Sequence, residues 1–89
     1  MDEEIEYVIS NHAKSMIQER NLDEDWLWRA LRSPDEISRG KDGNLHVFKE
    51  IPEKNNKYIH LIINDENTPH RIVTIFFDRR ASVKRKSNQ

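Results

Sequence analysis

The sequence predicts an α+β domain in which two N-terminal helices pack on a four-stranded antiparallel meander sheet. Three observations support this fold class. Apolar residues follow helical spacing as far as Leu31, and after Pro34 they alternate with a period of two, as in half-buried strands. The pair Asp42-Gly43 separates two of the alternating runs and is typical of a tight hairpin turn. Helices grouped in the chain before such a sheet pack on one of its faces.

The first helix is expected over Ser10–Arg20, because the apolar residues around and within this range follow helical spacing. These residues are Ile5, Val8, Ile9, Ala13, Met16 and Ile17. Ser10 is the preferred N-cap, since its hydroxyl can accept from a backbone N–H group of the first turn. Two alternatives stay open: Asp2 could cap a longer helix, and the segment Glu6–Ile9 could be extended. Asn21 is predicted to end the helix, because Asn tolerates the left-handed conformation.

The second helix is expected to begin at Asp23, an N-cap residue followed by Glu24 and Asp25, whose charges favour the first turn of a helix. Its apolar face consists of Trp26, Leu27, Ala30 and Leu31. Pro34 ends it, because the residue before a proline is pushed out of the helical region.

Four strands follow, at residues 35–40, 45–51, 57–64 and 71–77. The last is the most apolar and is therefore expected to be the central strand. The predicted core consists of Ile72, Val73, Ile75, Phe77, Leu61, Ile63, Trp26 and Leu31. A single domain is expected over residues 1–81, with a basic and disordered tail at 82–89.

The composition excludes several classes of protein. The chain has 89 residues and no cysteine, which excludes disulfides and zinc-thiolate sites. It contains neither an apolar stretch of about 18 residues nor a secretory signal pattern, so we expect a cytoplasmic protein without a membrane partner. No cofactor or metal is expected. The net charge is −5 over residues 1–45 and +4 over residues 46–89, which is compatible either with a polyanion-binding face or with charge balance between the two halves.

Four motifs occur in an order and spacing that resemble a known family. They are Ser10-x-His12-Ala13, the Arg-Asn-Leu at 20–22, the Leu-Arg-Ser-Pro at 31–34 and the segment Ile72–Arg80. Together they resemble the small bacterial and archaeal domains known as domain of unknown function 4258, in the RelE-like part of the barnase–EndoU–colicin–RelE group. The resemblance covers roughly residues 8–80.

The resemblance implies a RelE-like fold and an RNA-cleaving toxin held by a cognate antitoxin protein. A non-enzymatic relative that keeps the fold and binds a protein or a nucleic acid is the alternative. One departure from the family pattern favours the alternative. Met16 stands where the family often has an arginine, one helical turn after His12, and a His–Arg pair at that spacing would suit a phosphate.

Metal-independent RNA cleavage needs a proton acceptor, a proton donor and cations near the phosphate. We predict His12, His60 and Arg79 as catalytic residues, because histidine titrates near neutral pH and arginine presents paired donors to phosphate. The predicted RNA-binding residues are Lys49, Arg71, Arg80, Lys84 and Arg85. The ordinary alternatives are a helix-capping His12, a solvent-exposed strand histidine at position 60, and arginines and lysines that only solubilise the surface.

His46 and His60 are both expected on the sheet face that opposes the core. A meeting of the two histidines across neighbouring strands is possible there, but it depends on a strand register that the sequence does not specify. The oligomeric state is likewise not specified.

Overall fold

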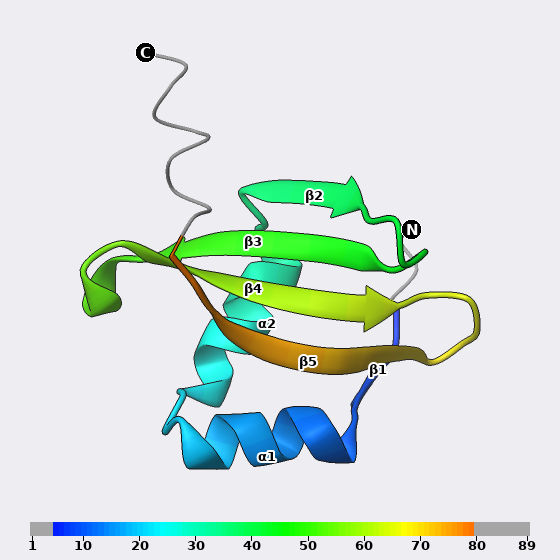
Figure 1. Ribbon diagram of the computed structural model, residues 1–89, viewed down its shortest axis with the longest axis horizontal. Coiled ribbons are helices and arrows are strands. Elements are labelled where there is room, and N and C mark those ends of the chain that lie inside the picture. Colours follow the sequence, from blue (N-terminus) through cyan, green and yellow to red (C-terminus); the bar gives the residue numbers. More distant parts are fainter. Residues whose placement is uncertain (1–4, 80–89) are drawn as a thin grey trace.

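The computed structural model describes residues 5–79. The elements in this part of the chain are β1 (Tyr7–Ile9), α1 (Asn11–Glu19), α2 (Glu24–Arg32), β2 (Glu36–Arg39), β3 (Leu45–Ile51), the 3-10 turn η1 (Pro52–Lys54), β4 (Lys57–Asn64) and β5 (His70–Asp78) (Figure 1). The predicted α+β class is confirmed. The predicted domain boundary at residue 81 and the predicted tail at 82–89 lie outside the described residues. No helix within residues 5–79 is long and apolar enough to cross a membrane.

The sheet has five strands in the order β1-β5-β4-β3-β2. The prediction of four antiparallel strands is therefore wrong in one respect, since β1 pairs in parallel with β5 and makes the sheet mixed. Tyr7 lies opposite His70, and the backbone N–H of Ser10 continues the pairing by donating to the carbonyl of Ile72. Backbone groups on the outer edge of β5 would otherwise be unpaired, so the short strand covers an exposed sheet edge.

The same pairing corrects the expected position of β5. It is flanked by β1 and β4, but the middle strand of the sheet is β4. β5 is apolar because it has a neighbouring strand on each side, and a strand needs both neighbours in order to be buried. It does not have to be the middle strand of the sheet.

Both helices begin and end at the residues that the sequence indicated. Ser10 caps α1, because its hydroxyl oxygen accepts from the backbone N–H of Ala13 at 3.0 Å. Asn21, just beyond α1, has a φ of 55°, the left-handed conformation expected of it. Asp23 caps α2 by accepting from the backbone N–H of Asp25 at 2.9 Å, and Ser33 ends this helix before Pro34.

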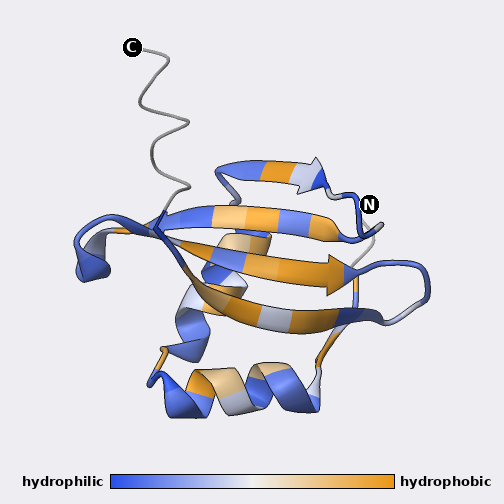
Figure 2. Ribbon diagram, in the orientation of Figure 1, coloured by the Kyte–Doolittle hydropathy of each residue, from blue (hydrophilic) through white to orange (hydrophobic). Residues whose placement is uncertain are grey.

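One hydrophobic core lies between the two helices and one face of the sheet. Its fully buried members include Ala13 on α1, Leu27 on α2 and the strand residues Ile51, Ile59, Leu61, Ile72 and Ile75. Figure 2 shows the apolar centres of β4 and β5 between polar turns and strand ends.

Most of the predicted core is confirmed. Trp26, Leu61, Ile63, Ile72 and Ile75 are buried in it. Leu31 and Phe77 are half-buried and pack against it, and the Phe77 ring meets the Trp26 ring edge-on at 5.7 Å. Val73 is outside this cluster, because β4 and β5 shift register there: Ile62 lies opposite Thr74, and Ile63 opposite Ile72.

Candidate functional site

The sheet face opposite the core, which we call the open face, carries a row of three aromatic rings across three strands. Phe48 on β3 lies opposite His60 on β4, and His60 lies opposite Phe76 on β5. The ring centroids are 4.1 Å apart for Phe48 and His60 and 4.8 Å apart for His60 and Phe76. We call these three residues the aromatic row. Phe48 and Phe76 are half-buried, so parts of both rings face solvent.

His60 was expected to face away from the core, and it does. It is nevertheless only 7% exposed, because the two flanking phenylalanine rings cover it. It is therefore not the solvent-exposed strand histidine that was the ordinary alternative.

His60 is also part of a chain of hydrogen-bonded side chains that runs along the open face. His46 Nδ1 lies 2.9 Å from His60 Nε2, and His60 Nδ1 lies 3.0 Å from Asp78 Oδ2. At the other end, His46 Nε2 lies 3.2 Å and 3.3 Å from the two carboxylate oxygens of Asp42. We call Asp42, His46, His60 and Asp78 the Asp–His–His–Asp row. The cross-strand meeting of the two histidines, left open by the sequence, is thus realised.

The environment shifts two pKa values in the row. Burial lowers the pKa of His60, and the hydrogen bond and negative charge of Asp78 oppose this effect without reversing it. The pKa of Asp42 is lowered because the backbone N–H of Asn44 and the ring of His46 stabilise the carboxylate. The row thus favours an uncharged His60 and an ionised Asp42.

Gly40 allows the outer end of the row to form. A Cβ atom at this position would lie 2.5 Å from His46 Nε2 and 2.7 Å from Asp42 Oδ1, which is closer than real Cβ atoms approach. A side chain on residue 40 would therefore have to displace the contact between His46 and Asp42.

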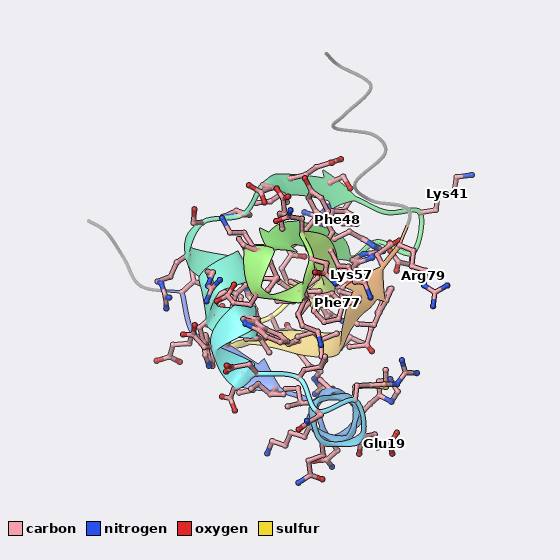
Figure 3. All side chains as sticks on the ribbon, turned by 90° about the vertical axis from the view of Figure 1, so that its left-hand side faces the viewer. Glu19, Lys41, Phe48, Lys57, Phe77 and Arg79 are labelled. Carbon is pink, nitrogen blue, oxygen red and sulfur yellow. The ribbon has the colours of Figure 1, made fainter. Side chains whose placement is uncertain are left out.

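A cationic pocket lies at the end of the sheet where β5 finishes. Its volume is about 310 Å³. It is lined by Arg20, Asn21, Leu22, Lys54, Lys57, Phe76, Phe77 and Arg79. The lining thus has four cations and no carboxylate, and within residues 5–79 none of the four cations forms an ion pair. Figure 3 looks toward this end, where Lys57, Phe77 and Arg79 lie, with Glu19 at the end of α1 outside the lining.

The pocket and the open face adjoin each other. Phe76 lines the pocket, and its ring packs against that of His60. Asp78, the inner end of the Asp–His–His–Asp row, is the chain neighbour of the pocket residue Arg79. A chain of several linked units could therefore occupy both at once.

The structure brings together only some of the predicted site residues. His60 and Arg79 lie at the same end of the sheet, one in the rows and one in the pocket. His12 is exposed in the first turn of α1, whose cap Ser10 contacts Val73. Arg79 follows Val73 by six residues, roughly 20 Å at the usual rise of a strand, so His12 and Arg79 lie near opposite ends of β5. A single phosphate between His12 and Arg79 does not fit this arrangement.

Of the predicted RNA-binding residues, Lys49 and Arg71 lie in the described part of the chain, and neither lines the pocket. Lys49 points to the helix side of the sheet, where its ammonium lies 3.8 Å from Asp35. Arg71 is exposed near the start of β5, away from the pocket. Arg80, Lys84 and Arg85 lie outside the described residues.

Sequence reasoning missed Lys54, Lys57 and the two aspartates of the row, and it gave Arg20 only a family match. The motif at residues 20–22 was a usable signal, because all three of its residues line the pocket. The aspartates gave no such signal, since they meet the histidines only through the strand register and the turn at residues 40–44.

A second, apolar groove of about 340 Å³ lies between β1 and α2, lined by Ile5, Tyr7, Trp28, Leu31 and Arg32. Trp28 is half-buried here and donates from its indole N–H to Glu24.

Within residues 5–79, no three His, Asp or Glu side chains are grouped so that they could hold a metal ion.

No curated protein and no solved structure matched the chain. The family model described as Domain of unknown function (DUF4258) matches residues 9–77, a range that includes the α1 cap, both rows except Asp78, and most of the pocket lining. The chain therefore belongs to the DUF4258 family.

Proposed function

We propose that the chain is a RelE-like domain that binds single-stranded RNA across the open face. The observation that carries the proposal is the cationic pocket, with four cations and no carboxylate in its lining, directly beside an aromatic row. Proteins that bind single strands combine these two features, with cations along the backbone and aromatic rings under the bases.

The pocket suits a phosphate group. Arg20 and Arg79 present planar pairs of donors that match phosphate oxygens. Lys54 in the turn after β3 and Lys57 at the start of β4 add charge. No internal carboxylate competes for these cations within the described residues, so binding of a phosphate need not break an existing ion pair.

The aromatic row suits unpaired bases. Stacking of a base on an aromatic side chain is worth about 1–3 kcal/mol and accepts any base. An antitoxin protein that covers the open face would be the natural partner of such a domain.

The proposal is tested by the affinity for a single-stranded RNA oligonucleotide over a salt series. We expect Arg79→Ala and Arg20→Ala each to weaken binding and to lower the slope of log K against log salt by roughly 0.7. Lys14→Ala, an exposed cation on α1 away from the pocket lining, is the matched control and should keep both values. A parent protein without measurable RNA affinity at low salt would refute the proposal.

Binding of a partner protein is the second candidate function, and the apolar groove beside β1 favours it. Ile5 is 56% exposed there, next to the half-buried rings of Tyr7 and Trp28. Co-purification with a co-expressed antitoxin, lost in Trp28→Ala but not in Arg79→Ala, would place the protein partner on this groove and not on the open face.

A further inference from the structure

The hydrogen bonds of the Asp–His–His–Asp row are all satisfied when its two histidine rings together hold three protons. Both carboxylates accept hydrogen bonds, so His46 Nε2 must be protonated toward Asp42, and His60 Nδ1 must be protonated toward Asp78. The two remaining ring nitrogens are 2.9 Å apart, and two lone pairs would repel each other there. One further proton must lie between them, which makes three protons on two imidazoles.

Of the two rings, His46 has the surroundings that better suit the extra proton. Burial disfavours a charge on His60, as its lowered pKa indicates, while the side chain of His46 is 19% exposed and lies against the ionised Asp42. In this state His46 is doubly protonated, and His60 is neutral, accepting from His46 and donating to Asp78.

We propose that His46 is the catalytic proton donor of an RNA-cleaving centre on the open face, with His60 and Asp78 as positioning residues. This inference rests on the proposed RNA binding, which would bring the ribose-phosphate chain over the row. Its geometric basis is that the row has a fixed inner end and an accessible outer end. The side chain of Asp42 is 46% exposed, whereas that of Asp78 is 23% exposed and that of His60 is 9% exposed.

The step that this geometry supports is an internal transesterification. The ribose O2′ attacks phosphorus and forms the O2′–P bond, while its proton passes to a water molecule. The P–O5′ bond breaks, and O5′ receives the proton of His46 Nε2. The products are a 2′,3′-cyclic phosphate and a 5′-hydroxyl, and solvent returns a proton to His46.

Loss of the Nε2 proton leaves the inner part of the row intact. His46 Nδ1–H still donates to His60 Nε2, and His60 Nδ1–H still donates to Asp78. The ring orientation is therefore the same before and after proton transfer, so no reorganisation of the histidines is required. Asp42 occupies the outward Nε2 position in the free protein, and the substrate must replace it there.

Several charged groups stand around the row and will shape its titration. Asp42 reaches it from the turn before β3 and Asp78 from β5. Glu36 on β2 and Glu50 on β3 stand on the same face, opposite Phe48 and Tyr58 respectively. Arg79 follows Asp78 at the pocket end.

The experiment measures cleavage of a single-stranded RNA oligonucleotide by the full chain, and binding of the same sequence with 2′-O-methyl groups, which cannot be cleaved. We expect the parent to produce 2′,3′-cyclic phosphate ends. His46→Ala should lower the rate about 10²–10⁴-fold, the usual contribution of a general acid, and added imidazole should restore part of it. Lys14→Ala should match the parent in both measurements.

The positioning role of Asp78 is tested by the pH profile. Asp78→Asn removes a negative charge that favours the protonated pair, so the alkaline limb of the rate profile should move to lower pH. A residue that only supports the fold would lower the rate without moving the limb. Gly40→Ala, which displaces the His46–Asp42 contact without removing a titratable group, should change the cleavage rate while Arg79-dependent binding persists.

The two proposals fail in different ways. A parent that binds the 2′-O-methyl RNA but does not cleave the unmodified strand overturns the catalytic centre and leaves RNA binding intact. Cleavage by His46→Ala at the parent rate also overturns the centre. A parent that binds neither oligonucleotide overturns both proposals.

Discussion

Replacement of Ser10 by Ala should destabilise the protein, because the Ser10 hydroxyl makes two contacts at once. Its oxygen accepts from the backbone N–H of Ala13 at 3.0 Å, and it donates to the carbonyl of Val73 at 2.9 Å. A lost N-cap costs about 0.5–2 kcal/mol and a lost hydrogen bond about 0.5–1.5 kcal/mol, which together predict about 1–3.5 kcal/mol. For a small domain with a stability of about 5 kcal/mol, this is a large fraction.

The assay is urea unfolding followed by tryptophan fluorescence, with the midpoint shifted to lower urea and the slope unchanged. Ser10→Thr keeps the hydroxyl and should retain most of the stability. His12→Ala changes an exposed side chain two residues away and should stay within about 0.5 kcal/mol of the parent. If Ser10→Ala also stays within that limit, the double role of the hydroxyl is refuted.

Three other outcomes are expected. Leu61→Ala, at a fully buried site on β4, should cost about 2–5 kcal/mol of stability. Phe77→Ala should cost less than the roughly 3–5 kcal/mol typical of a fully buried Phe, because Phe77 is only half-buried. A larger drop of the urea midpoint for Phe77→Ala than for Leu61→Ala would contradict the core described above. Burial lowers the pKa of His60, so the unfolded chain binds more protons than the folded one between the folded pKa of His60 and about 6.5. The contribution of His60 to stability should be full above this pH window and fall as the pH drops through it. His60→Gln should flatten the decrease of the melting temperature with falling pH. The hydrogen bond from Arg39 lowers the pKa of Asp65, so this pair should stabilise the fold above the unfolded pKa of Asp65. The stabilisation should be lost as the pH falls through the lower pKa that Asp65 has in the folded protein. An acid-unfolding curve of Arg39→Ala that matches the parent's would disprove this prediction.

The motif that begins with Ser10 can now be divided by role. Ser10 caps α1 and joins it to β5, and Ala13 is fully buried where the helix packs on the sheet. His12 is the exposed member between them. Met16, one helical turn after His12, is half-buried against the core, so its side chain points to a different environment from that of His12.

The sequence by itself determined the local structure of this protein. Ser10 and Asp23 start the two helices, Asn21 and Pro34 end them, and Asp42-Gly43 turns the first hairpin. Each of these features depends on hydrogen bonds and backbone conformations within a few residues of the chain, so residue type is enough to predict them. The alternation of apolar residues also placed His60 correctly on the face away from the core.

Tertiary structure alone decided the fifth strand and the candidate site. Tyr7–Ile9 is a strand only because the outer edge of β5, more than 60 residues away, offers it backbone partners. The contact between His46 and His60 depends on the β3–β4 register. The cationic pocket joins residues from the segment after α1, the turn after β3, the start of β4 and the end of β5. Such contacts depend on how distant segments pack against each other. The free energy of this packing is shared by the whole core, so no single stretch of sequence is enough to predict it.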